Sequence, residues 1–144
     1  MERWWGDMTD RARFGFLLWW WLVCAAGCAS GAPVQKVIAY YFHVTARCVT
    51  CQAIEQYAKE AVERGFPEEL KKGVLEWRPV NVQLLENRHF IRDYRLYTRS
   101  LVLVEVRDGK QVEWRNLEKV WELVGRKSDF LKYVRAHVST YLGE

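Results

Sequence analysis

The sequence predicts an α/β domain: a mixed four-stranded sheet with helices on both faces, in a three-layer sandwich. Three observations support this prediction. The continuous apolar run Val37–Phe42 has the residue types of a buried strand. Segments with helical spacing alternate with later strand-like runs, which is typical of a parallel strand–helix–strand unit. Finally, Asp108-Gly109 is a two-residue turn between two of those runs, which predicts an antiparallel hairpin.

The composition fits one domain of ordinary size preceded by a leader. The chain has 144 residues, half of them hydrophobic, and eight tryptophans. The net charge is +4, and the charges are interspersed without a basic block, so nucleic-acid binding is not indicated. No motif indicates a cofactor, and we expect none.

Residues 1–28 have the three parts of an export signal. Arg11 and Arg13 precede the apolar run 14–23, and small residues follow it. The run is short for a membrane-spanning helix, which needs roughly 20 residues. We therefore expect a signal peptide or lipoprotein leader that delivers the domain to the periplasmic side of a bacterial membrane.

The leader ends in Ala25-Ala26-Gly27-Cys28, which resembles the bacterial lipobox. That resemblance implies that Cys28 is lipidated and becomes the mature N-terminus. Ala25 stands where the lipobox usually has leucine, so an uncleaved tryptophan-rich anchor and cleavage by ordinary signal peptidase are alternatives. Residues 29–33 are a small-residue tether, and the domain spans residues 34–144.

The domain begins with a buried strand, predicted over residues 34–44 from its β-branched and aromatic content. Cys48 and Cys51 come next. Apolar residues then repeat at helical spacing: Ile54, Ala58, Ala61 and Val62. Gly65 followed by Pro67 ends this helix.

Three further strands and a helix are predicted after that. Residues 74–83 form a strand, in which Pro79 cannot donate to the ladder and therefore favours an edge position or a bulge. Residues 86–97 form a helix with one apolar side. Strands over residues 101–106 and 111–114 flank the tight turn.

Two helices complete the domain. The first has its apolar residues between Leu117 and Val124 and stops at Gly125. Ser128 or Asp129 caps the second. Its apolar face is Leu131, Val134, Val138 and Tyr141 or Leu142. Five aromatic residues are most simply core: Tyr40, Tyr41, Trp77, Trp114 and Trp121.

The two thiols are the candidate reactive site. Cys48 stands at the N-terminus of a predicted helix, whose partial positive charge favours the reactive thiolate. We expect Cys48 to attack and the more buried Cys51 to resolve the mixed disulfide. Arg47 adds positive charge beside Cys48. Thr50 either donates a hydrogen bond to the Cys48 sulfur or helps to cap the helix.

This order of elements, with Cys-x-x-Cys after the first strand, resembles the thioredoxin fold over residues 34–142. A longer pattern includes Tyr-Tyr-Phe-His-x-Thr-x-Arg-Cys-x-Thr-Cys, Val-Asn-Val and Tyr-x-Leu-Tyr-Thr-Arg-Ser. It is similar to the ArsF family of bacterial thioredoxin-like proteins, named for a nitrophenyl-compound reductase. These resemblances imply thiol–disulfide exchange at the cysteine pair.

Two positions depart from the thioredoxin pattern. Thioredoxin uses a buried acidic residue on this strand to move protons. Phe42 occupies about that position here, and its side chain cannot titrate. Arg99-Ser100-Leu101 takes the place of the cis-proline that faces the redox pair. Because cis bonds outside proline are rare, we expect a trans loop with Ser100 or Arg99 facing the sulfurs.

His43 is a candidate proton carrier or ligand, although a histidine on a strand is more often structural. Cys48, Cys51 and one histidine make three ligands, whereas a closed zinc site needs four, so no metal site is predicted. A soft metal such as Cu(I) accepts fewer ligands. Metal delivery is therefore an alternative function.

The leading hypothesis is an exported, membrane-tethered thiol–disulfide oxidoreductase that acts on a protein disulfide or dithiol. A membrane protein would supply its electrons, because the periplasm lacks the soluble reductants of the cytosol. The alternatives are a lipoprotein that binds or delivers a soft metal and a redox-inert accessory subunit of a reductase. One group of basic residues is interpreted as a solvated face rather than an acidic docking surface: Arg88, Arg92, Arg95 and Arg99.

Overall fold

The structure, a computed structural model, describes residues 35–143. The predicted leader, the tether and the lipidation residue Cys28 lie outside the described residues. Within the described part, no helix has both the length and the apolar character needed to cross a membrane.

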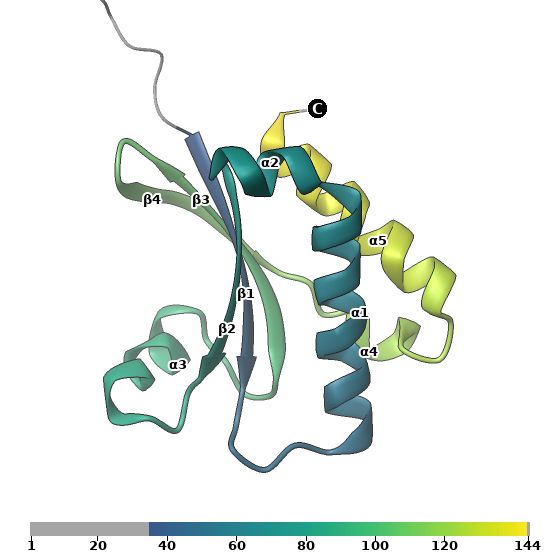
Figure 1. Ribbon diagram of the computed structural model, residues 1–144. Coiled ribbons are helices and arrows are strands. Elements are labelled where there is room, and N and C mark those ends of the chain that lie inside the picture. The colour runs from purple at the N-terminus through teal and green to yellow at the C-terminus, as the bar shows by residue number, and fades with distance from the viewer. Residues whose placement is uncertain (1–34, 144) are drawn as a thin grey trace, which may run out of the picture. The chain divides into compact units, whose positions relative to one another are not determined.

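Four strands form one mixed sheet in the order β2-β1-β3-β4 (Figure 1). The central strand β1 (Gln35–His43) pairs in parallel with β2 (Leu75–Asn81) and antiparallel with β3 (Ser100–Arg107). The hairpin is completed by β4 (Lys110–Asn116). Because β1 has a strand on each side and helices over both faces, its continuous apolar run is buried, as expected. Pro79 lies on β2 at a sheet edge, which confirms one of its two predicted placements.

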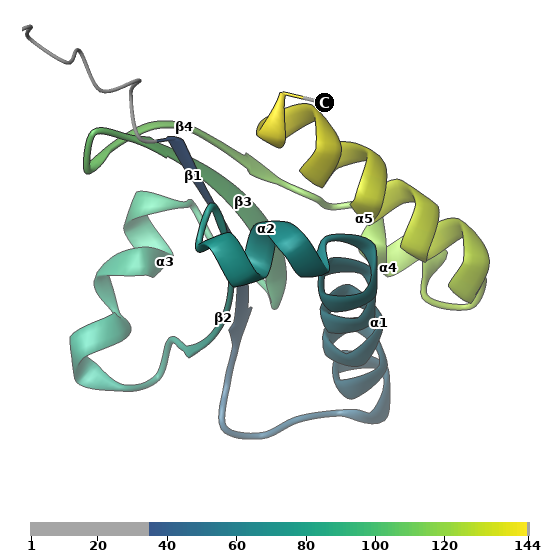
Figure 2. The same cartoon turned by 45° about the horizontal axis from the view of Figure 1, so that its top comes forward.

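One face of the sheet is covered by α1 (Val49–Gly65) and α5 (Lys127–Leu142) (Figures 1 and 2). Two short helices accompany them, α2 (Pro67–Lys72) and α4 (Val120–Leu123). The larger core cluster fills the space between these helices and the sheet. It includes strand residues such as Tyr41, Leu101 and Leu103, and helix residues such as Ile54 on α1 and Phe130 on α5. Leu131, predicted on the apolar face of the last helix, is only partly buried against this cluster.

The opposite face carries α3 (His89–Asp93), which follows a single 3-10 turn, η1 (Leu85–Asn87). Strand alternation divides β1 between the two cores: Tyr41 packs on the α1 face, whereas Tyr40 and Phe42 pack on the α3 face. Helices therefore lie on both faces, as predicted. A parallel β1–α1–β2 unit joined to the β3–β4 hairpin is a thioredoxin-like fold.

The predicted helix over residues 86–97 is wrong in length. The chain forms η1 and α3 instead, and α3 ends at Asp93. Tyr94 is buried against the aromatic rings of the α3-face cluster, and Arg95 takes a left-handed backbone conformation with φ 51°. That conformation cannot continue a helix. The burial of Tyr94 thus ends α3 well before Tyr97.

The predicted caps of the last helix are also wrong. Arg126 is the N-cap of α5, and no side chain donates or accepts a cap hydrogen bond there. Asp129 lies inside the first turn and pairs with Arg126 at 3.5 Å. A carboxylate in the first turn interacts favourably with the positive end of the helix dipole. Asp129 therefore stabilises α5 without capping it.

The other boundaries differ modestly from those predicted. The helix predicted over residues 117–124 is reduced to α4, because the residues before it form tighter turns, in which Val120 donates its N–H to the Leu117 carbonyl and Trp121 to that of Glu118. The hairpin turn forms as predicted, with positive φ at both Asp108 (51°) and Gly109 (75°).

Candidate redox site

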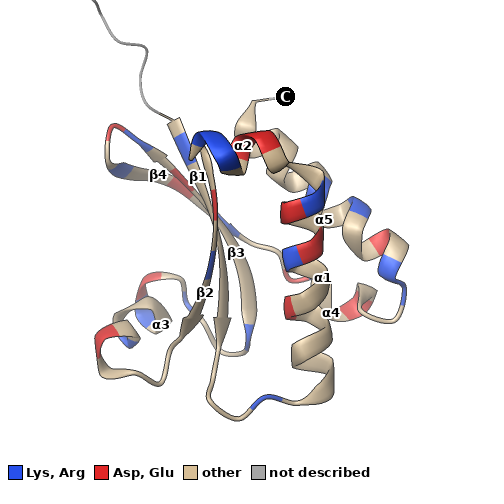
Figure 3. Cartoon of the chain, in the orientation of Figure 1, with Lys and Arg blue, Asp and Glu red and all other residues tan. Residues whose placement is uncertain are grey.

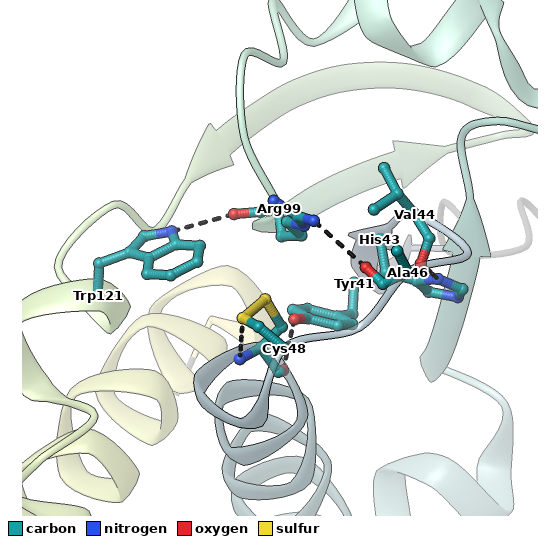
Figure 4. Close-up of a disulfide and its surroundings, with 8 residues drawn as sticks. Tyr41, His43, Val44, Ala46, Cys48, Arg99 and Trp121 are labelled. Atoms are coloured by element: carbon teal, nitrogen blue, oxygen red, sulfur yellow. Dashed lines mark hydrogen bonds between the residues drawn. A yellow bond between two sulfur atoms is a disulfide. The ribbon is translucent and has the colours of Figure 1, made fainter.

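Cys48 and Cys51 form a disulfide at the N-terminus of α1, with their Cα atoms 5.1 Å apart (Figure 4). Cys48 is the N-cap residue, and its Sγ accepts a hydrogen bond from the Cys51 N–H at 3.1 Å. Cys48 is exposed, whereas Cys51 is only 2% exposed. An accessible sulfur facing helix N-terminal N–H groups, with a buried sulfur one turn in, is the geometry of an attacking and a resolving thiol.

Tyr41 fixes the backbone of this turn to the central strand. Its hydroxyl donates to the Cys51 carbonyl at 2.7 Å, and its ring is buried. The sequence pattern places the buried acid of thioredoxin at about Phe42. Because side chains alternate along β1, Phe42 instead packs on the α3 face and Tyr41 is the one that faces α1. The pKa of Tyr41 is raised to about 12, chiefly by burial and further by the charge of Glu55.

The raised pKa of Tyr41 predicts a loss of stability in strong alkali. Between pH 10 and 12 the unfolded tyrosine releases its proton while the folded one keeps it, so the free energy of unfolding falls as pH rises. Tyr41→Phe removes this dependence, which for one group is at most about 1.4 kcal/mol per pH unit. At neutral pH the variant should lose about 1 kcal/mol with the hydrogen bond. Urea unfolding at pH 8, 10 and 11 measures both effects. Identical slopes in the parent and the variant would contradict the prediction.

Arg47 is less available to Cys48 than its position in the sequence indicates. Its guanidinium forms an ion pair with Glu55 and lies 2.8 Å from Nε2 of His43. A guanidinium only donates, so Nε2 accepts, and Nδ1 is left to donate to the Val44 carbonyl at 3.2 Å. Both ring nitrogens of His43 are thus engaged, which fits the structural interpretation of this residue. The carboxylate of Glu55 offsets part of the positive charge that Arg47 brings to the site.

Thr50 does not occupy the cap position, because Cys48 does. Its side chain is exposed, and its hydroxyl has no hydrogen-bond partner among residues 35–143. Val49 beside it is 84% exposed. The two residues between the sulfurs therefore form the outer surface of the site.

The loop before β3 places Ser100 and Arg99 on opposite sides. Ser100 pairs with Phe42 across the sheet, so it shares the α3 face, and its Oγ donates to the Thr98 carbonyl at 3.1 Å. It therefore points away from α1 and the sulfurs. All peptide bonds in the described part are trans, including those of this loop.

Arg99 connects this loop to the segment that leads into the cysteines. Its Nη2 donates to the Ala46 carbonyl at 3.3 Å, and its own carbonyl accepts from Trp121 Nε1 at 3.0 Å (Figure 4). Trp121, expected simply as core, thus also fixes the position of the loop. Spacing along the chain gives no signal for this contact, because it joins residues from separate elements.

A pocket of about 460 Å³ adjoins the loop that leads into the cysteines, although neither cysteine lines it. One wall is the loop between β1 and α1, including Val44 and Ala46, and the other is the segment from Leu96 to Arg99. Val82 and Ile91 add apolar surface to it. Among residues 35–143, no group of three or more His, Cys, Asp or Glu side chains is placed to hold a metal ion.

Comparison with known proteins identifies a similar solved structure. No protein-family model matches the chain, and no curated protein matches it significantly. The X-ray structure of Fasciola hepatica thioredoxin is 23% identical, and the match covers 64% of this chain and 81% of that chain, with a TM-score of 0.38.

Proposed function

We propose that this protein is a thiol–disulfide oxidoreductase. One observation supports it above the others: in a thioredoxin-like fold, an exposed Cys48 and a buried Cys51 form a disulfide at the N-terminus of α1. A cysteine pair that forms a disulfide and exposes one of its sulfurs to solvent can undergo thiol–disulfide exchange with a second disulfide or dithiol.

The exchange proceeds in two balanced steps when the protein acts as a reductant. The Cys48 thiolate attacks one sulfur of the substrate disulfide, forming a mixed disulfide and releasing the other substrate sulfur as a thiolate. Cys51, having lost its proton, then attacks the Cys48 sulfur. This closes the Cys48–Cys51 disulfide and releases the second substrate thiolate. Two electrons pass from the pair to the substrate, whose two thiolates take up protons from solvent, and oxidation of a substrate dithiol is the same path reversed.

Reduction of an insulin-type disulfide tests the proposal. The purified full chain, with dithiothreitol as electron donor, should accelerate precipitation of the reduced insulin chains well beyond the dithiothreitol control. Equilibration with glutathione redox buffers then gives the reduction potential of the pair, which determines the direction of electron flow. A rate no greater than that of dithiothreitol alone, from a chain whose pair equilibrates with the buffer, would contradict the proposal.

We further propose that the domain is exported and held at the periplasmic face of a bacterial membrane by a lipid on Cys28. The apolar run, the small residues before Cys28 and the short tether support this. The tether would enter β1 at the end opposite the cysteines, about 30 Å away along nine residues of strand. The mass of the mature chain tests this, because an unmodified N-terminus would contradict it.

Two partners belong to this proposal. The substrate is a protein disulfide or dithiol, and a membrane protein supplies the electrons when the pair acts as a reductant. The narrower resemblance to the ArsF family stays a prediction, resting on the motif that surrounds the cysteines.

A further inference from the structure

Arg99 is a partly buried cation without a counter-ion in the described part of the chain. It forms no ion pair there, and of its five N–H donors one, on Nη2, reaches a protein acceptor, at 3.3 Å. Its Nε is fully buried without a hydrogen-bond partner. Leaving a buried charged group unpaired is costly. The N–H groups on Nη1 also have no acceptor in the described part, so an external anion can bind this end of the guanidinium.

The other arginines near the site do not share this state. Arg47 is held by Glu55 and His43. On the outer surface of α3, Arg92 lies 3.6 Å from Asp93 and is solvated. Figure 3 shows both signs of charge along the segment around α3. Arg88 and Arg95 form no ion pair in the described part either, but both are exposed to solvent. The feature that sets Arg99 apart is a guanidinium nitrogen buried without a hydrogen-bond partner.

Arg99 also lines the apolar pocket, whose walls include Phe42 and Leu96 from the α3-face cluster. The carbonyl that it contacts, that of Ala46, is two residues before Cys48. The adjoining pocket wall is apolar, with Val44, Val82 and Leu96. A polypeptide whose cysteine reacts at Cys48 would have to extend past Ala46 to place neighbouring side chains against the guanidinium and in this recess.

We propose that Arg99 and this pocket select polypeptide segments that carry a carboxylate side chain and an apolar side chain next to the reacting cysteine. The inference rests on the proposed function and names its substrate class. The carboxylate would accept two hydrogen bonds from the guanidinium, the strongest arrangement that arginine offers. The apolar side chain would fill the recess and orient the substrate sulfur toward Cys48. Small acidic thiols lack the apolar group, which is why a polypeptide is the better occupant.

Matched peptide disulfides test the selection. Each substrate is a disulfide-linked dimer of a short peptide with leucine on one side of the cysteine and either Glu or Gln on the other. The full chain with dithiothreitol should favour the Glu peptide over the Gln peptide about tenfold in kcat/KM. Arg99→Gln should bring this ratio to about one, and Arg99→Glu should reverse it in favour of a Lys peptide. Arg64→Gln, an exposed change at the far end of α1, should keep the parental ratio.

The outcomes separate this inference from the proposed function. Absence of turnover with every peptide would contradict the oxidoreductase itself. Turnover without an acidic preference would overturn only the role of Arg99. An Arg99→Gln variant that slows both peptides equally, with the ratio intact, would show a purely structural arginine. Glutathione disulfide turned over as well as the Glu peptide, with the same dependence on Arg99, would overturn the polypeptide as occupant.

Discussion

Cys48→Ser is expected to lower dithiol-dependent disulfide reduction by a thousandfold or more, because removing the attacking group of a covalent mechanism costs at least about that factor. Serine fits the exposed N-cap position and can accept the hydrogen bond that the Cys48 sulfur accepts from the Cys51 N–H. The fold should therefore survive while the nucleophile is lost. Insulin reduction, with circular dichroism of the same sample, measures both.

Cys51→Ser is the matched variant, and it should block a different step of the exchange: resolution of the mixed disulfide instead of the first attack. Cys48 can still attack, but nothing resolves the mixed disulfide, so a covalent adduct with the substrate accumulates on a non-reducing gel. Cys48→Ser should form no such adduct, because Cys51 is 2% exposed and cannot reach a protein disulfide. Adducts formed by Cys48→Ser and not by Cys51→Ser would reverse the assigned roles.

Phe130→Ala is expected to remove about 3–5 kcal/mol from the free energy of unfolding, the largest effect expected on stability. The ring is 0% exposed in the core between α5, α1 and the sheet. It meets the Tyr57 ring edge-on at 5.7 Å between centroids. Since a domain of this kind has only about 5–15 kcal/mol in all, the variant should be marginally folded at 37 °C. Urea unfolding with the disulfide intact provides the measurement.

Lys132→Ala on the same helix is the control for Phe130→Ala. Its side chain is exposed, so its replacement should change the free energy of unfolding by no more than about 0.5 kcal/mol. A Phe130→Ala cost similar to that of Lys132→Ala would contradict the placement of α5 against the sheet.

Several elements are predictable from residues that lie close together in the chain. β1 is apolar on both faces because it is central, so its strand was evident from composition alone. The Asp-Gly turn specified the β3–β4 hairpin through the positive φ that both residues adopt. The spacing Cys48-x-x-Cys51 before a helical repeat located the redox pair. Each of these signals lies within a few neighbouring residues.

The surroundings of the cysteine pair depend on contacts between residues that are far apart in the chain. Burial of Tyr94 ended α3 early, although the local spacing favoured a longer helix. Tyr41 reaches Cys51, and Arg99 reaches Ala46, across separate elements of the chain. Such contacts depend on strand register and on how α1 packs against the loop before β3. Local periodicity in the sequence predicts neither of these. The thiols were predicted from sequence, whereas the unpaired Arg99 beside them became evident only once the chain was folded.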